Sequence, residues 1–106
     1  FVRGSVFADD DVRHGWDTTT GALGDAIEVV EELKPLLTGD GRTLAQAAIG
    51  WLWGCSAATI PIPGFKSVKQ VEDSAAALER GPLADVQMRG IAEHLCGIGW
   101  DRCRFA

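Results

Sequence analysis

The chain contains no tyrosine. No phenol of this chain can therefore give or take a proton in catalysis. The sequence also has no apolar run near the roughly 20 residues that a membrane span requires. Positive charge is scarce, because 10 Lys and Arg stand against 15 Asp and Glu and give a net charge of −5. A deficit of this kind argues against the basic face on which nucleic acids or anionic membranes bind, so we expect neither partner.

Cysteine is infrequent as well. Cys55, Cys96 and Cys103 form an odd set without the spacing of a metal site. A bridge between Cys96 and Cys103 is one interpretation, and reduced thiols in a cytosolic protein are the interpretation that we favour. The sequence begins with Phe1 and shows no basic region followed by an apolar core. We therefore expect no signal peptide, a cytoplasmic location, and a segment of a longer polypeptide.

Three consecutive aspartates, Asp9 to Asp11, lie in a stretch without sustained periodicity. A metal ion needs ligands that converge from several directions, which neighbouring residues rarely provide. The run is more typical of a solvated loop, with one aromatic residue at Trp16. We assign no metal ligand here and no role to His14.

What the sequence does contain is helical periodicity. Its 106 residues, 46% of them hydrophobic, are enough for one domain or a piece of one. A first helix is predicted over residues 22–37, where apolar side chains recur at steps of four, three, three and four: Leu23, Ile27, Val30, Leu33 and Leu37. The threonines at 18–20 offer cap oxygens before it. Pro35 is expected to end or tighten its last turn.

Two capping boxes predict the next two helices. Thr43 with Gln46 opens a nearly all-apolar helix over 43–54, and Ser67 with Gln70 opens a helix over 67–79. The second of these should bury one apolar face, made of Val68, Val71, Ala75 and Leu78. Gly81 suits its C-terminal end. A fourth helix is predicted over 83–95, with Met88, Ile91 and Leu95 facing inward.

A single strand signal lies at residues 59–62. Pro61 and Pro63 have no amide to donate to a sheet, so a central place in a regular sheet is not expected. The predicted fold class is therefore mainly α with one short β-strand.

The stretch around residue 64 has features that suit an anion. Gly64 can adopt a positive φ and leaves room for a ligand. The amides that open the following helix carry partial positive charge, and Lys66 adds a full one. The same residues also fit a plain glycine turn into a capped helix with a solvated lysine. On physical pattern alone that second interpretation is the commoner one.

A family resemblance favours the anion site. The run Ile60-Pro61-Ile62-Pro63-Gly64-Phe65-Lys66-Ser67, followed by Gln70 and by Asp73-Ser74, resembles the last strand–turn–helix unit of the aldo-keto reductases. The resemblance implies that Lys66 and Ser67 meet the 2′-phosphate of NADP(H), and that Gln70 and Asp73 lie by the adenosine. The implied cofactor-binding set is Gly64, Phe65, Lys66, Ser67, Gln70, Asp73 and Ser74. Asp73 and Ser74 replace the Glu and Asn that are usual in that family.

The resemblance covers residues 1–95 and implies their place in a (β/α)8 TIM barrel. Residues 10–16 resemble the loop after strand 7, residues 43–51 resemble helix 7, and residues 81–83 resemble the start of the C-terminal segment. The segments between them then supply strand 8 and helix 8. Residues 96–106 are expected to form a tail. The chain is thus predicted to be the C-terminal portion of a barrel, incomplete as a stand-alone domain.

The implied function is that of an oxidoreductase, with NADPH-dependent carbonyl reduction in the complete protein. The family's catalytic Tyr, Asp, Lys and His precede the part represented here, so we assign no catalytic residue and expect the isolated chain to be inactive. Apolar surface on the helix at 44–53 is expected to promote self-association. The alternative is a small helical protein-interaction module without a cofactor.

Overall fold

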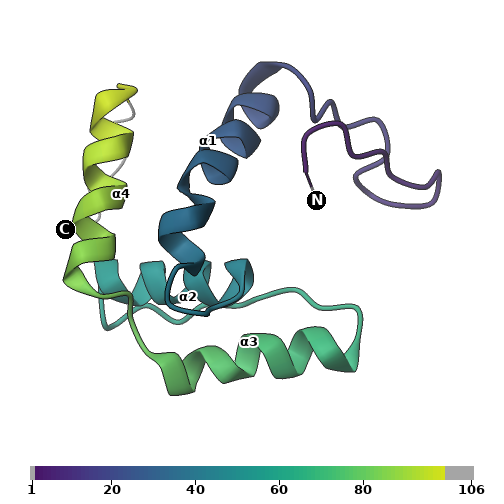
Figure 1. Ribbon diagram of the computed structural model, residues 1–106. Coiled ribbons are helices and arrows are strands. Elements are labelled where there is room, and N and C mark those ends of the chain that lie inside the picture. The colour runs from purple at the N-terminus through teal and green to yellow at the C-terminus, as the bar shows by residue number, and fades with distance from the viewer. Residues whose placement is uncertain (1, 100–106) are drawn as a thin grey trace. The chain divides into compact units, whose positions relative to one another are not determined.

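A computed structural model describes residues 2–99 and contains four helices within them (Figure 1). They are α1 (Gly21–Thr38), α2 (Leu44–Cys55), α3 (Val68–Arg80) and α4 (Asp85–Gly97). The four predicted helices are confirmed, and every boundary lies within two residues of its expected place. Cys103 and most of the predicted tail lie outside the described residues. The chain divides into two units, residues 1–33 and residues 34–106, which are described separately.

The loop in the first unit is organised by an arginine. Asp11 accepts hydrogen bonds from Nε and Nη2 of Arg13, at 2.9 and 2.8 Å. The guanidinium lies 4.3 Å from the ring centre of Phe7, which in turn makes an edge contact with Trp16. One carboxylate of the aspartate run is therefore used in an ion pair. Among residues 2–99 there is no cluster of side chains that would hold a metal ion.

Asp17 organises the start of α1. Its carboxylate accepts the hydroxyl protons of Thr19 and Thr20 and also their backbone N–H groups, at 2.8 and 3.1 Å for the two amides. The Thr18 hydroxyl donates to the carbonyl oxygen of Ser5 instead. The threonines were predicted to offer cap oxygens, but in the structure their hydroxyls act as donors. The carboxylate, two residues before Thr19 and three before Thr20, is a charged acceptor and therefore a strong partner for these protons.

This arrangement predicts acid sensitivity at the start of α1. Donation from the Thr19 hydroxyl, then from the Thr20 hydroxyl and the two amides, holds the pKa of Asp17 well below its ordinary value. A lowered pKa in the folded state gives stability that is present above about pH 4 and is lost as the pH falls toward the folded pKa. Protection of the amides at residues 19–24 from hydrogen exchange, relative to their intrinsic rates at each pH, should therefore fall on acidification below about pH 4. An Asp17→Asn variant should lack this transition, and an unchanged transition in that variant would contradict the assignment.

α1 differs from its expected form in two details. Ile27, Leu33 and Leu37 are buried as predicted, whereas Val30 is 42% exposed. The helix continues through Pro35 for three more residues to Thr38, so the proline does not end it. A proline has no amide to donate to the carbonyl oxygen four residues earlier, so α1 continues past Pro35 without that one bond. No helix within residues 2–99 has the length and apolar character needed to cross a bilayer.

In the second unit, α2 packs against both α3 and α4. Ala47 and Ala77 are completely buried, and Leu83 and Ile91 are almost so. Gly50 permits a close approach, because a Cβ there would lie 2.5 Å from Nη1 of Arg42 and 3.1 Å from the Gly81 carbonyl oxygen. The same glycine accepts a hydrogen bond from the Leu83 amide at 3.1 Å. Small residues on α2 thus bring the turn between α3 and α4 against the helix backbone.

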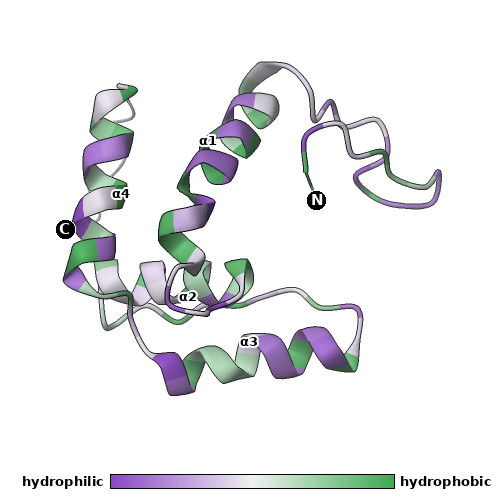
Figure 2. Cartoon of the chain, in the orientation of Figure 1, coloured by the Kyte–Doolittle hydropathy of each residue, from purple (hydrophilic) through white to green (hydrophobic). Residues whose placement is uncertain are grey.

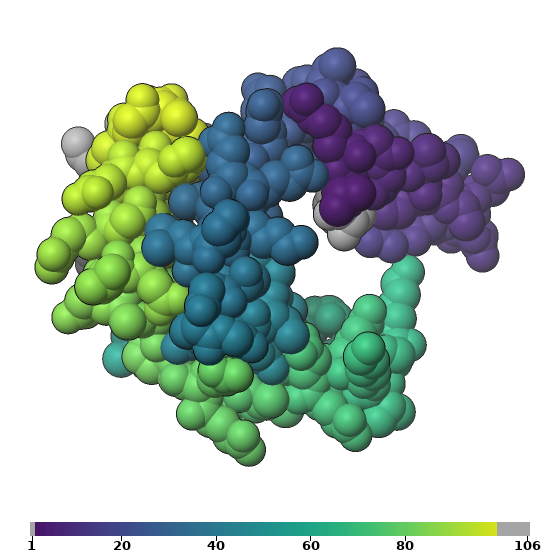
Figure 3. Space-filling view, viewed as in Figure 1, coloured from purple at the N-terminus to yellow at the C-terminus, as the bar shows by residue number. Residues whose placement is uncertain are grey.

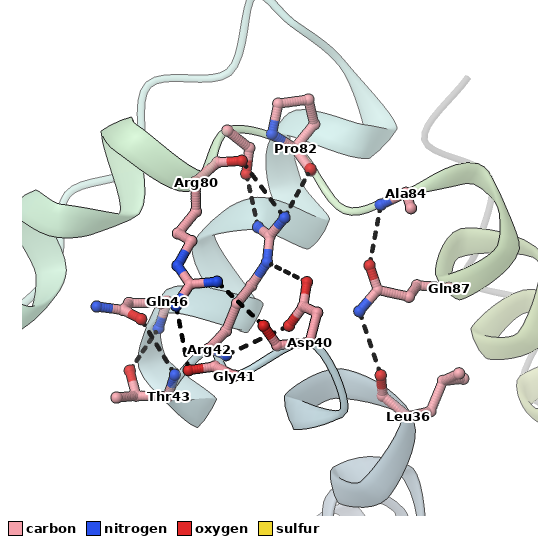
Figure 4. Close-up of polar contacts among 11 residues, drawn as sticks. Leu36, Asp40, Gly41, Arg42, Thr43, Gln46, Arg80, Pro82, Ala84 and Gln87 are labelled. Atoms are coloured by element: carbon pink, nitrogen blue, oxygen red, sulfur yellow. Dashed lines mark hydrogen bonds and ion pairs between the residues drawn. The ribbon is translucent and has the colours of Figure 1, made fainter.

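Arg42 joins the turn before α2 to the end of α3 (Figure 4). Its guanidinium donates to the carbonyl oxygens of Gly81 at 2.7 Å and Pro82 at 3.0 Å, and its Nε donates to Asp40 at 2.8 Å. The arginine side chain is 7% exposed. Burial raises the pKa of Asp40, but the hydrogen bonds and charge of Arg42 outweigh it and leave that pKa below its ordinary value. One buried cation therefore satisfies carbonyls that follow a helix C-terminus, where the backbone has no donors of its own.

The predicted strand at 59–62 was wrong. Residues 59–62 have no regular secondary structure, and no strand occurs within the described part of the chain. A strand exists only through a ladder of hydrogen bonds to a neighbour. Pro61 and Pro63 cannot donate, and residues 2–99 provide no second strand. The fold of the described residues is therefore helical.

The inward face predicted for α3 was also wrong. Val68 and Leu78 are 74% and 73% exposed, and Val71 is 38% exposed, whereas the buried residue is Ala77. Apolar and polar bands alternate along α3 in Figure 2, and Figure 3 shows this helix at the molecular surface. α3 packs on α2 through its small residues because these allow the closest backbone approach. Its large apolar side chains and one alanine form an exposed stripe, which we call the α3 stripe: Val68, Val71, Ala75 and Leu78.

Candidate functional site

The segment that leads to the candidate site is attached at its start. The indole N–H of Trp53 on α2 donates to the carbonyl oxygen of Thr59 at 3.2 Å. The chain then runs outward, with Ile60 and Ile62 exposed by 84% and 93%. The segment ends at Ser67, the N-cap of α3. The candidate anion-binding residues thus lie between a point fixed to α2 and the start of a 13-residue helix.

The start of α3 is closed by side-chain hydrogen bonds. Ser67 has extended backbone dihedral angles, and its hydroxyl accepts the Gln70 amide at 3.2 Å. The Gln70 side chain accepts the backbone N–H of Lys66 at 2.6 Å, one residue before the N-cap. The predicted serine cap is therefore confirmed, while its glutamine partner binds the amide preceding the one expected. This second bond fixes the backbone of Lys66 next to the helix end.

The electrostatics of this end favour an anion. The first turn of α3 contains no acidic residue. The amides of Val68 and Lys69 belong to the first helical turn and have no carbonyl one turn earlier within the helix. The side chains of Lys66 and Lys69 are exposed beside them. An exposed lysine thus stands on either side of the N-cap in sequence, at the positive end of the helix macrodipole.

Gly64 provides space at this place. A Cβ on Gly64 would meet no atom within 4 Å. Its backbone does not adopt a positive φ, so the first of the two reasons predicted for a glycine there, a positive φ, was wrong. Phe65, next to it, is 61% exposed. The surroundings of Gly64 are therefore open.

The remaining predicted site residues lie further along α3. Asp73 and Ser74 are half-buried, and the carboxylate of Asp73 accepts hydrogen bonds from Thr43 and Gln46 of the α2 N-terminus. The structure thus brings Gly64, Phe65, Lys66, Ser67 and Gln70 together and directs Asp73 toward α2. Sequence reasoning identified Thr43 and Gln46 as a capping box. Their bonds to a residue about 30 positions away left no signal in the sequence.

Comparison with known proteins gives one clear match. The sequence model of the Aldo/keto reductase family matches residues 4–95, which include all four helices except the last two residues of α4. No curated protein and no solved structure matches the chain.

Proposed function

Since the chain belongs to the aldo/keto reductase family, we propose that it binds the adenosine phosphate end of NADP(H). The observation that carries the proposal is the start of α3. There the Ser67 cap, the fixed backbone of Lys66 and an acid-free first turn coincide in the family's phosphate-binding motif. When bound, NADPH supplies the hydride for carbonyl reduction. This chain's own part is to hold the phosphate by charge and by amide donors.

The residues present fit that group. Lys66 supplies a full positive charge for the 2′-phosphate, and Ser67 and the first-turn amides supply donors. Gly64 leaves the open space that a bulky anion needs. Phe65 and Gln70 flank the same place. A cation at the 2′-phosphate favours NADP over NAD, because NAD has no charge there.

We further propose that the chain forms the last part of a (β/α)8 barrel. Residues 59–62 would become strand 8 only when a neighbouring strand supplies its hydrogen-bond partners. The exposed α3 stripe and the exposed Ile60 and Ile62 support this proposal, because an apolar face of this kind is expected to be covered in a complete protein. Within this scheme residues 1–95 belong to the barrel and residues 96–106 form a tail.

Catalysis requires groups that this chain does not contain. The family's proton donor is a tyrosine, and the sequence has none. We therefore expect phosphate binding without turnover. Pure protein of confirmed mass should not oxidise NADPH in the presence of a reactive aldehyde, and measurable turnover would refute this part of the proposal.

The binding site is tested by titration of adenosine 2′,5′-bisphosphate and of 5′-AMP into the isotopically labelled chain. NMR amide shifts are expected to concentrate at residues 64–70 with the bisphosphate, because only it carries the 2′-phosphate. 5′-AMP should shift these amides much less. The proposal would be contradicted by equal shifts with both ligands. It would also be contradicted if the amides of residues 64–70 shifted no more than those of the rest of the chain.

A second candidate function is an interaction module without a cofactor. The α3 stripe favours it, because an exposed apolar helix face is a common protein-docking surface. Such a module would self-associate or bind a partner through α3 and would give no specific shifts at residues 64–70. Sedimentation of the chain detects self-association, and the NMR titration described above detects phosphate binding, so the two measurements together separate the two functions.

A further inference from the structure

Three polar side chains connect α3 to the N-terminus of α2. Oδ2 of Asp73 accepts the Thr43 hydroxyl at 2.9 Å. Nε2 of Gln46 donates to Oδ1 of Asp73 at 3.2 Å and to the Asp73 backbone oxygen at 2.9 Å. We call Thr43, Gln46 and Asp73 the α2–α3 anchor.

The anchor is continuous with the cap of α2. The Thr43 hydroxyl also accepts the Gln46 amide at 3.2 Å, and Oε1 of Gln46 accepts the Thr43 amide at 3.1 Å. Gln46 is 8% exposed, so its amide group is shielded from water and its oxygen and nitrogen are both bonded. Thr43 is exposed and Asp73 is half-buried, so Gln46 is the buried member, and its hydrogen bonds hold it in one arrangement. The orientation of Asp73 is therefore set by α2.

Both carboxylate oxygens of Asp73 are already engaged. If the Asp73 side chain turned toward an adenosine, it would break its bonds to the Thr43 hydroxyl and to Nε2 of Gln46, and Gln46 would keep only the Asp73 backbone oxygen as acceptor. Asp73 also lies six residues after Ser67, about 9 Å along the helix axis from the phosphate end. Its position suits a link between helices better than a contact with the ligand.

From these contacts we infer that Asp73 is a positioning residue, which with Thr43 and Gln46 fixes α3 on α2 and thereby holds Lys66 and Ser67 in place. This inference rests on the proposed function for its ligand, and it replaces the adenosine contact expected for Asp73. Loss of the anchor lets α3 shift, so it weakens the phosphate site without changing which base is preferred. If Asp73 instead contacted the adenosine directly, its loss would change the preference of the site for adenine.

Two dinucleotides separate these roles. NADPH and its deamino analogue, which carries hypoxanthine in place of adenine, differ in the exocyclic amino group that a carboxylate would accept. Asp73→Ala should weaken the binding of both by about threefold to tenfold and leave the ratio of their dissociation constants unchanged. Thr43→Ser, which keeps the hydroxyl, should bind both as the unaltered chain does. A ratio that moves toward one only in Asp73→Ala would overturn the inference.

A double-mutant cycle tests the anchor without any ligand. Asp73→Ala, Gln46→Met and the double variant are compared by the midpoint of urea unfolding. The double variant should lose clearly less than the sum of the single losses, because both changes remove the same bonds. Additive losses would overturn the anchor. If the unaltered chain binds neither dinucleotide, the proposed function fails, and this cycle alone then decides whether the anchor exists.

Discussion

Replacement of Lys66 by alanine is expected to weaken NADPH binding by about 10- to 100-fold and to leave NADH binding nearly unchanged. The basis is a charge-assisted contact with phosphate, typically worth about 1.5–3 kcal/mol, and NADH has no 2′-phosphate with which to make it. The backbone of Lys66 is fixed by Gln70 beside the helix end, so removal of its side chain should remove charge and leave the turn intact. Titration of both cofactors against both proteins measures the effect.

Lys34 provides a matched control. It is exposed on α1, and Lys34→Ala removes the same charge away from α3. This variant should bind both cofactors as the unaltered protein does, which excludes a general effect of net charge. Equal losses of NADPH and NADH affinity in Lys66→Ala would show that the lysine serves the fold, and the glycine-turn interpretation would then hold.

Local signals in the sequence were sufficient to predict the helices. The capping box at Thr43 and Gln46 marks the start of α2, and Gly81 marks the end of α3 with a φ of 70°. Such signals act over one or two turns, so they hold regardless of what the rest of the protein does. The cap at Ser67 was predictable for the same reason, and it places Lys66 next to the candidate phosphate site.

Signals that depend on distant partners were not sufficient. The strand at 59–62 needs a neighbour that the described residues do not contain. The inward face of α3 was predicted from its large apolar residues, but contact with α2 selected Ala77. The role of Asp73 depends on Thr43 and Gln46, which are close only in the folded chain. Periodicity shows that a face is apolar, and packing decides what covers it.

Arg42 is expected to be the side chain whose loss most damages the second unit. Three of its bonds, to Gly81, Pro82 and Asp40, would lose their donor together in Arg42→Ala. The carbonyl oxygens of Gly81 and Pro82 follow the C-terminus of α3 and would lose this donor. The variant therefore also leaves polar groups unsatisfied next to a void. We expect a loss of about 3 kcal/mol in the free energy of unfolding, a large share of the total for a domain of this size.

Urea unfolding followed by circular dichroism measures this loss, with Arg89→Ala as the matched control. Arg89 is exposed on α4, so its removal should change the free energy of unfolding by less than about 0.5 kcal/mol. The loss in the free energy of unfolding for Arg42→Lys should lie between those of the two alanine variants. An ammonium keeps the charge but cannot bond to Asp40 and both carbonyl oxygens with the planar geometry of a guanidinium. A loss in Arg42→Ala no larger than in Arg89→Ala would mean that water replaces the arginine. The end of α3 would then be held by the Leu83–Gly50 backbone bond and the packing of Ala77.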